Sequence, residues 1–476
     1  MSRDQIFSLL ILVACFLGCA SGIQSQCYDL KLSEEYAEAY AFPKQCMTAL
    51  HDQRGRAFLY TANLTHGLTI YDIELAGLAE VMNIPTSDMD DLAVTSIWQE
   101  GDYLYAALGD HFSDNENSGM AIIDVSDPQL ATVKDVWKRS SANGGAGIVR
   151  VSGNHAFLGA MQHGLVILDI TNKSDIQFVS EFVPDVNYPE SNPDPAKYNA
   201  RGMDIRDELV YLCYDAGGVR IIDVSDVNNP SEKGRYSLPA LNGLPRAYNN
   251  CVVSGNYLYV AIDYCGMEIL DVSDPASVTQ VAWWNEWNCE TAENNWFNSP
   301  GHTNEISYLP DCNIIGMSAG KSEAVFVDVG DPQNPFLCST FGNTSNSQGT
   351  WGISVYEDVF YLGYIFVPLG IPFFSNYGGV KAVSVDHSCA LSVGDLKQSS
   401  HLTTFYDPTL DHLVVNTGDI KTPEIIISVH DMLGRQLIRQ ALDEGRTIGL
   451  NRTVSGPVVV TAEWGGIMEH HWVAIP

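Results

Sequence analysis

Apolar and polar positions alternate in short runs along most of the chain, and one pattern returns at regular intervals. A glycine, four mostly apolar residues and an aspartate occur with the same spacing at residues 67–72, 119–124, 164–169, 218–223 and 266–271. Short runs of β-branched, aromatic and other apolar residues bounded by turn residues are typical of β-strands. The pattern therefore predicts one repeated strand in five clear copies.

Two weaker copies extend the series. Residues 323–328 keep the aspartate but begin with Glu323, and residues 379–384 keep the glycine but end in Ser384. An apolar strand precedes each copy, and most copies are followed by a turn rich in Asp, Ser and Pro, which ends strand pairing, and then by a further short strand. With one more strand upstream, the sequence predicts seven units of four strands, about one every fifty residues.

Four-stranded units repeated without helical periodicity between them are typical of a β-propeller. A solenoid of such units would need capping repeats, and neither end of the series shows one. We therefore predict an all-β protein with a seven-bladed β-propeller over residues 23–399. The repeat stops near residue 402, and the alternating strands that follow predict a small β-sandwich over residues 400–476.

The repeated segment resembles a known family. Residues 165–169, Leu-Val-Ile-Leu-Asp, are similar to the LVIVD repeat of bacterial surface and secreted proteins, over roughly residues 45–390. The resemblance implies a propeller and no particular reaction.

The C-terminal region carries a second resemblance. Residues 431–437, Asp-Met-Leu-Gly-Arg-Gln-Leu, are similar to a hairpin in the C-terminal sorting domain of the type IX secretion system of Bacteroidetes. Residues 406–408 stand where that family opens on Pro-Asn-Pro, and the family's terminal lysine is absent. The resemblance implies an export address with the type IX secretion machinery as partner. An ordinary carbohydrate-binding or immunoglobulin-like appendage is the alternative.

The N-terminus predicts export. Arg3 precedes an apolar run over residues 6–17 and then small residues, which is typical of a signal peptide, here residues 1–22. Residues 16–19 also resemble a lipoprotein box in which Cys19 would carry lipid. No later segment is apolar for about twenty residues, so we expect no transmembrane segment in the mature chain. The expected location is the medium or the outer-membrane surface.

The net charge narrows the choice of partners, and the cysteines suggest disulfide pairs. With 58 acidic and 25 basic residues, the net charge of −33 repels phosphate backbones and makes nucleic acid an unsuitable partner. Nine cysteines follow residue 22, and export permits disulfides. Local pairing suggests Cys27 with Cys46 or Cys289 with Cys312, and the odd number leaves at least one thiol unpaired or bonded between chains.

Ligand candidates lie where the inner strands of the blades converge on the central channel. Alignment of the units on their turns places six side chains near the starts of inner strands. They are Arg201, Arg246, Asn249, His302, Glu305 and Trp351. Cationic and aromatic groups around a pore suit ligand binding, although the same residues could simply close the rim through hydrogen bonds.

Four insertions interrupt the repeat, at residues 110–118, 183–200, 284–302 and 364–377. Two are rich in aromatic residues and could bind a ligand or pack on a neighbouring blade. One of them holds three tryptophans suited to stacking on sugar rings, Trp284, Trp287 and Trp296.

The first insertion offers carboxylates for calcium but lacks the spacing of an EF-hand loop. These carboxylates belong to Asp110, Asp114 and Glu116. Three histidines near the repeated glycines, His66, His111 and His163, could bind a transition metal or serve as turn residues.

No common catalytic signature is present, whether a Gly-x-Ser-x-Gly elbow, a His-Glu-x-x-His helix or a phosphate-binding loop. We therefore expect a non-catalytic binding or adhesion module for a glycan or for a surface or secreted protein, with no cofactor other than calcium. The alternative is a propeller-type polysaccharide lyase or glycoside hydrolase. That enzyme would take its acid and base groups from Glu305, His302 and Arg246.

Overall fold

The computed structural model divides into two compact units, residues 1–390 and 391–476. It describes residues 30–37, 45–74, 79–113, 115–142, 144–287, 289–290, 301–319, 323–342, 347–368, 374–385, 403–407, 412–416, 425–431, 436–442, 447–449, 456–464 and 467–475. The predicted signal peptide and Cys27 lie outside these ranges. None of the helices in these ranges is long and apolar enough to cross a bilayer.

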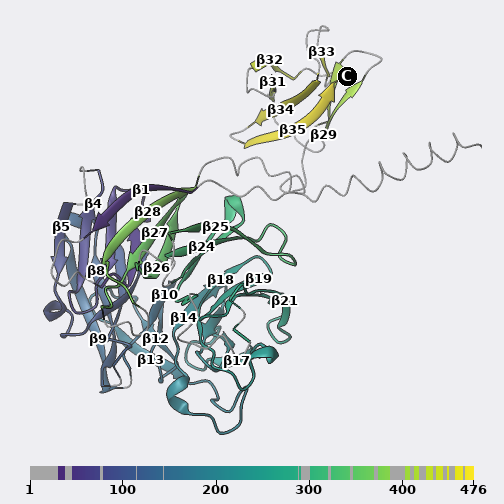
Figure 1. The fold of residues 1–476 in the computed structure, drawn as a ribbon. Coiled ribbons are helices and arrows are strands. Elements are labelled where there is room, and N and C mark those ends of the chain that lie inside the picture. The colour runs from purple at the N-terminus through teal and green to yellow at the C-terminus, as the bar shows by residue number, and fades with distance from the viewer. Residues whose placement is uncertain are drawn as a thin grey trace, which may run out of the picture. The chain divides into compact units, whose positions relative to one another are not determined.

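The first unit is a β-propeller of seven four-stranded antiparallel sheets, which confirms the predicted repeat architecture (Figure 1). From the inner to the outer strand, the first four blades are: blade one, β2 (Thr48–His51), β3 (Phe58–Ala62), β4 (Leu68–Asp72) and β5 (Ala79–Ile84); blade two, β6 (Val94–Glu100), β7 (Tyr103–Leu108), β8 (Asn117–Asp124) and β9 (Thr132–Ala142); blade three, β10 (Ile148–Ser152), β11 (His155–Gly159), β12 (Leu165–Asp169) and β13 (Gln177–Phe182); and blade four, β14 (Gly202–Arg206), β15 (Leu209–Cys213), β16 (Val219–Asp223) and β17 (Ser231–Tyr236).

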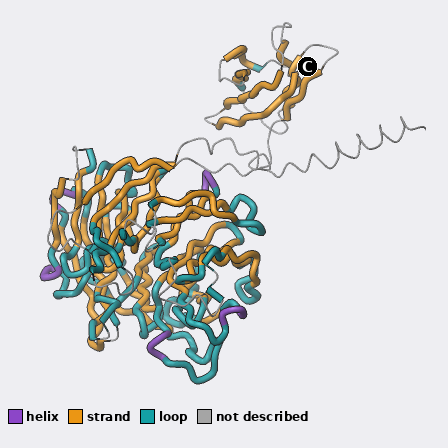
Figure 2. Tube along the Cα trace, viewed as in Figure 1, coloured by secondary structure: helices purple, strands orange, loops and turns teal. Residues whose placement is uncertain are grey.

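The remaining three blades follow in the same order. They are: blade five, β18 (Tyr248–Ser254), β19 (Tyr257–Ile262), β20 (Gly266–Asp271) and β21 (Thr279–Trp284); blade six, β22 (Ile306–Leu309), β23 (Ile314–Ser318), β24 (Ala324–Asp328) and β25 (Phe336–Phe341); and blade seven, β26 (Thr350–Tyr356), β27 (Val359–Tyr364), β28 (Gly379–Val385) and β1 (Leu30–Ala37). The helices of the described residues are short 3-10 turns between strands, η1 (Thr86–Asp88), η2 (Pro128–Leu130), η3 (Pro195–Lys197), η4 (Pro239–Leu241) and η5 (Pro310–Cys312) (Figure 2).

The repeated glycine and aspartate frame the third strand of a blade. Gly67 has φ +83°, and a Cβ there would lie 2.1 Å from the carbonyl oxygen of Ile84, so a side chain does not fit. At the other end of the strand, the Asp271 carboxylate accepts a hydrogen bond from the Ser273 amide at 2.8 Å and closes the turn. The two ends of the pattern therefore shape the blade.

Blade seven is closed by a strand from the opposite end of the unit. β1 pairs antiparallel with β28, from Leu30 opposite Val385 to Ala37 opposite Gly379. The Ser33 hydroxyl adds a hydrogen bond to the Ala382 carbonyl at 2.9 Å. The N-terminal strand thus completes the ring.

The apolar core lies between neighbouring blades. Leu68 and Ile70 of blade one pack with Leu104 and Ile123 of blade two in one buried cluster, and similar clusters join the other neighbours. Because both faces of a blade are covered, its middle strands read as continuous apolar runs.

The C-terminal unit contains two sheets. One consists of β29 (Thr403–Asp407), β30 (His412–Asn416) and β33 (Thr447–Gly449), and the other of β32 (Gln436–Ala441), β31 (Ile426–Asp431), β34 (Gly456–Trp464) and β35 (Ile467–Ile475). Leu413 of the first sheet and Ile427 of the second belong to one buried apolar cluster. The strands β31 and β32 pair antiparallel, as the hairpin resemblance predicts.

A disulfide joins Cys265 to Cys289, with Cα atoms 5.3 Å apart. The predicted pairing of Cys289 with Cys312 is therefore wrong. Cys265 lies in the turn between β19 and β20, beside the loop that follows β21 in the same blade, whereas Cys312 belongs to η5 of the next blade. Cys265 and Cys312 lie almost equally far from Cys289 along the chain, so membership of the same blade decides the pairing.

Candidate functional site: the central channel and its mouth

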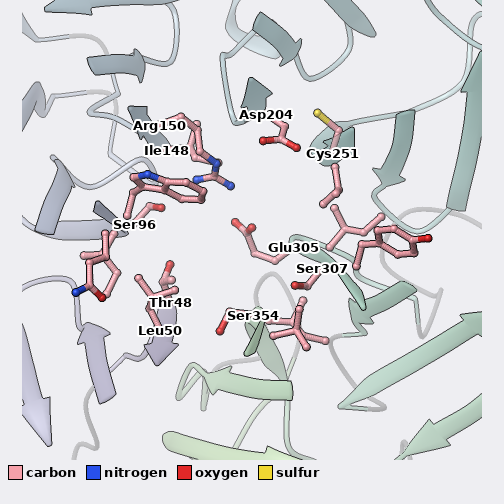
Figure 3. Close-up of a pocket in the computed structure, with 18 of the residues that line it drawn as sticks. Thr48, Leu50, Ser96, Ile148, Arg150, Asp204, Cys251, Glu305, Ser307 and Ser354 are labelled. Atoms are coloured by element: carbon pink, nitrogen blue, oxygen red, sulfur yellow. The ribbon is translucent and has the colours of Figure 1, made fainter. Parts of the chain in front are cut away.

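The inner strands present equivalent residues to the central channel. The strand register aligns Thr48, Ser96, Ile148, Gly202, Asn250, Glu305 and Gly352 at one level. Two residues further along lie Leu50, Trp98, Arg150, Asp204, Val252, Ser307 and Ser354. Side chains of both levels line a cavity of about 300 Å³, here called the channel cavity (Figure 3).

Four residues immediately before the first level come together at the channel mouth. They are Arg201, Asn249, Asn304 and Trp351, from blades four to seven. Asn304 Oδ1 lies 3.5 Å from Arg201 Nη2 and accepts a hydrogen bond from Asn249 Nδ2 at 3.3 Å. The Arg201 guanidinium carbon is 5.8 Å from the centre of the Trp351 ring. We call this set, with the residues added below, the mouth site.

Two β-bulges re-aim mouth residues. The ladder between β18 and β19 skips Asn249, and the ladder between β26 and β27 skips Trp351. A bulged residue leaves the strand pairing, and its side chain can turn toward the end of the channel. These irregularities explain how alternate strand positions reach one site.

His302 and Asp263 add an acid–base pair to the mouth site. His302 Nδ1 lies 2.7 Å from Asp263 Oδ1, and the His302 ring is 5.8 Å from the Trp351 ring in an edge-on arrangement. Tyr264 lies against the same histidine, with ring centres 4.8 Å apart. A histidine this close to a carboxylate is an arrangement found where protons are transferred.

Asp215 contributes a second carboxylate from the turn between β15 and β16. Burial raises its pKa to about 6, against the opposing charge of Arg201 and a hydrogen bond from Asn199, while the charge of Asp263 raises it further. Asn199 Nδ2 donates to Asp215 Oδ2 at 2.8 Å. The other carboxylate oxygen is buried without a hydrogen-bond partner among the described residues.

His111 and Phe112 form an aromatic edge of the mouth site. Their rings lie 5.6 Å and 5.0 Å from the Trp351 ring, and Phe112 is 50% exposed. Burial, together with the charge of Arg201, holds the pKa of His111 well below its ordinary value. The imidazole is therefore neutral at physiological pH.

Several buried polar atoms of the mouth site have no hydrogen-bond partner within the described parts of the chain. They are both ring nitrogens of His111, Oδ1 of Asp215, Oδ1 of Asn249 and Nδ2 of Asn304. Buried polar atoms in folded proteins are nearly always paired, with protein or with water. The mouth site thus concentrates buried polar atoms whose hydrogen bonds the described residues leave unsatisfied.

Glu305 stands between the mouth site and the channel cavity. Burial raises its pKa to about 7, although the Asn250 amide and the charges of Arg150 and Arg201 act in the opposite direction. Asn250 Nδ2 donates a short hydrogen bond to Glu305 Oε2. Glu305 therefore keeps its proton to a much higher pH than an exposed glutamate does.

Five of the six residues predicted at the starts of inner strands lie in this region, namely Arg201, Asn249, His302, Glu305 and Trp351. Arg246 differs. Its guanidinium donates to the carbonyls of Ala216 and Leu241 and pairs with Glu190 at 3.0 Å. These contacts hold two loops together and occupy the group.

The tryptophan-rich insertion does not present an open aromatic surface in its described part. Trp284 is 6% exposed in the core between blades five and six, and Trp287 packs edge-on against it at 5.4 Å. Trp296 lies outside the described residues. Apolar contact with blade six explains the burial of Trp284.

In the described ranges no three His, Cys, Asp or Glu side chains form a metal-binding group. Asp110 accepts a hydrogen bond from the Phe112 amide at 2.9 Å, Glu116 is partly exposed, and Asp114 lies outside those ranges. His66 is exposed in its turn and His163 lies 3.4 Å from the Ser141 hydroxyl, so neither joins His111.

Sequence reasoning missed Asp215, Asp263 and Asn304 of the mouth site, and Trp98 and Arg150 of the channel cavity. A signal was present for Asp215. In the sequence, Asp215 stands at the turn position where blades one and three carry Leu64 and Met161. All three residues share a left-handed backbone, with φ +44° for Asp215 and +47° for the other two. A carboxylate in place of a buried apolar residue of the repeat marks a specialised blade.

The fold and the channel define a repeat β-propeller with a polar site at one mouth. The family described as LVIVD repeat matches residues 93–134, 143–183, 199–237 and 246–285, which correspond to blades two to five. The chain is thus a β-propeller that carries four LVIVD repeats. No curated protein matches it.

Solved structures support the same fold. The β-propeller domain of Myceliophteria thermophila Cps50 (Swd1) is 12% identical with a TM-score of 0.52, covering 75% of this chain and 100% of that one. The WD40 repeats of RRP9 are 9% identical with a TM-score of 0.53, covering 76% and 99%. U3-55K is 9% identical with a TM-score of 0.53, covering 75% and 98%. Identities this low establish the fold alone.

Proposed function

We propose that the protein is a non-catalytic binding module that holds a glycan at the mouth site. The observation that carries the proposal is the group of buried, unpartnered polar atoms on His111, Asp215, Asn249 and Asn304. Sugar hydroxyls both donate and accept hydrogen bonds, so they suit a set that contains amide, carboxylate and imidazole groups together.

The aromatic edge supports a glycan over a protein ligand. The half-exposed Phe112 stands edge-on to Trp351 and leaves ring surface beside the polar atoms. An apolar ring next to hydrogen-bonding groups matches a sugar, which has apolar C–H faces and a polar rim. A surface or secreted protein is the other candidate ligand, and the experiment below distinguishes the two.

The proposal includes export to the cell exterior. The N-terminal pattern of residues 1–22 supports a signal peptide, and the Cys265–Cys289 disulfide supports an oxidising compartment. The two sheets of the C-terminal unit share a core, which supports a β-sandwich. We assign to this sandwich the role of a sorting domain for the type IX secretion machinery.

Binding of the full chain to an oligosaccharide array tests the function. Wild type is expected to bind a defined glycan, and Trp351→Ala and Asn249→Ala are each expected to weaken that binding at least roughly tenfold. Trp137→Ala on the outer strand of blade two is the matched control and should bind as wild type does. The assignment would be refuted if wild type bound no glycan, if all variants bound equally, or if wild type bound only a protein ligand.

The pair of His302 and Asp263 favours a second candidate, a polysaccharide lyase. In that reaction His302 would take the proton from C5 of a uronate, the C4–O bond would break, a C4=C5 double bond would form, and the departing oxygen would take up a proton. Incubation with a panel of uronate polysaccharides distinguishes the candidates. If the absorbance of unsaturated uronate increased with wild type and not with His302→Ala, the lyase function would replace the binding function.

A further inference from the structure

The channel cavity is distinct from the mouth site in position and in charge. Its walls carry the hydroxyl groups of Thr48, Ser96, Ser307 and Ser354, together with the charged side chains of Arg150, Asp204 and Glu305. At about 300 Å³ it has the size of a small-molecule site. Figure 3 shows the Arg150 guanidinium and the Glu305 carboxyl group pointing into this space.

Arg150 is the group whose charge is least compensated in the channel cavity. Its guanidinium lies 4.6 Å over the Trp98 ring and donates from Nη1 to the Val149 carbonyl at 3.0 Å. Its Nε is buried without a hydrogen-bond partner among the described residues. Stacking on an aromatic ring fixes the plane of the guanidinium and leaves its edge available for a planar anion.

The two carboxyl groups of the cavity are already engaged. Asp204 accepts backbone hydrogen bonds on both oxygens, from the amides of Ile205 and Val253 at 2.9 Å each. Glu305 accepts a hydrogen bond from Asn250, and burial raises its pKa to about 7, so a large fraction is uncharged at neutral pH. In its protonated form Glu305 can donate a hydrogen bond to an anion.

We propose that the channel cavity binds a small hydroxylated carboxylate, a sugar acid, with its carboxylate on Arg150 and its hydroxyl groups on the serine and threonine side chains. The hydroxyls of Ser354 and Thr48 donate to backbone carbonyls, so they would accept hydrogen bonds from the ligand. A guanidinium presents two parallel N–H groups that match a carboxylate, which makes this pairing stronger than one to a neutral hydroxyl. In a chain of net charge −33, a guanidinium directed into an internal cavity is a specific local attraction for an anion. The ligand is either a free sugar acid or the uronate end of a glycan.

Calorimetric titration of the full chain with D-glucuronate, with D-glucose and with an oligosaccharide that ends in glucuronate tests the proposal. Wild type should bind glucuronate and not glucose. Arg150→Gln should weaken glucuronate binding roughly tenfold or more, while Arg150→Lys should retain part of it. Ser307→Trp, which fills the cavity and leaves the charges in place, should also abolish binding.

Arg235→Gln, on the outer strand of blade four, is the matched control and should bind as wild type does. Equal affinity for glucose and glucuronate, binding of neither glucuronate nor the oligosaccharide by wild type, or unchanged binding in Arg150→Gln would overturn the proposal. If the oligosaccharide alone binds and depends on Arg150, the source is a glycan end; if free glucuronate binds as well as the oligosaccharide, it is the free acid. Trp351→Ala separates the two sites, because it should impair the mouth site and leave glucuronate binding intact.

Discussion

Glu323 occupies, in blade six, the position that glycine holds at residues 67, 164, 218 and 266, and it adopts the same left-handed backbone, with φ +74°. Its carboxylate accepts hydrogen bonds from the Lys381 ammonium at 2.8 Å and from the Tyr364 hydroxyl at 2.5 Å. Lys381 is 5% exposed and belongs to the next blade. The departure from the repeat thus creates a buried ion pair between blades six and seven.

Glu323→Gly should destabilise the propeller although it restores the glycine of the repeat. Relief of the left-handed backbone is worth about 1 kcal/mol, whereas a buried Lys381 ammonium left without its carboxylate costs about 3 kcal/mol or more. Urea unfolding followed by fluorescence measures the difference. Glu323→Gly with Lys381→Met should recover most of the loss, and a single variant as stable as wild type would contradict this reasoning.

Glu305 makes the stability of the propeller depend on pH. Because its folded-state pKa of about 7 lies above the ordinary value, the folded state holds more protons than the unfolded state between about pH 4.5 and 7. Stability therefore decreases as the pH rises through this window and levels off above it. A shift of this size corresponds to roughly 3 kcal/mol.

Glu305→Gln should consequently be more stable than wild type at pH 8 and similar to it at pH 5. The amide keeps an acceptor for Asn250 but carries no charge to be buried. Free energies of unfolding at the two pH values measure the effect. Burial also raises the pKa of Glu268 to about 7, so the variant must be compared with wild type. A stability difference between them that is the same at pH 5 and at pH 8 would show that Glu305 is not the titrating group.

At the level of strands, the local sequence pattern was sufficient to predict strands that pair with their neighbours in sequence. The third strands β4, β12, β16 and β20 begin and end where the repeated glycine and aspartate predict. The copies at residues 323–328 and 379–384, weak as sequence matches, also form third strands. Their apolar residues face neighbouring blades, and this burial leaves the strand intact when the glycine or the aspartate is lost.

The closing strand β1 could not be recognised in this way. Its sequence, Leu-Lys-Leu-Ser-Glu-Glu-Tyr-Ala, contains no repeat motif, and its partner β28 is about 350 residues away. Local patterns carry no information on pairing over such a distance. The bulges at Asn249 and Trp351 were likewise not predicted from the repeat.

A chain that begins at Gln45 should therefore lose stability, on the order of 5 kcal/mol, which for a unit of this size lowers the melting temperature by roughly 10 °C. Loss of β1 leaves the edge of β28 unpaired and the ring open. Thermal unfolding measures the change. A synthetic peptide of residues 30–37 added to the shortened chain should restore part of the stability, whereas a shortened chain that melts as wild type does would rule out this role for β1.

For the whole molecule, repetition predicted the number of blades, and the turns between strands predicted which residues begin the inner strands. These two features were sufficient to predict one region that contains Arg201, Asn249, His302, Glu305 and Trp351. The chemistry of the region was harder to predict. Burial decides that Trp284 belongs to the core, and the lack of hydrogen-bond partners distinguishes Asp215 and His111, yet neither property is visible in a sequence.

The pairing of β1 with β28 also has a consequence for the order of events during synthesis. The first strand of the ring to leave the ribosome is the last that can find its partner, since Ser33 meets Ala382 only after blade seven has been made. Contacts between residues so distant in sequence form slowly. Early blades can assemble while the ring stays open, and completion of the ring waits for the end of the unit. The ring of a newly made chain would thus remain open until its propeller is fully synthesised.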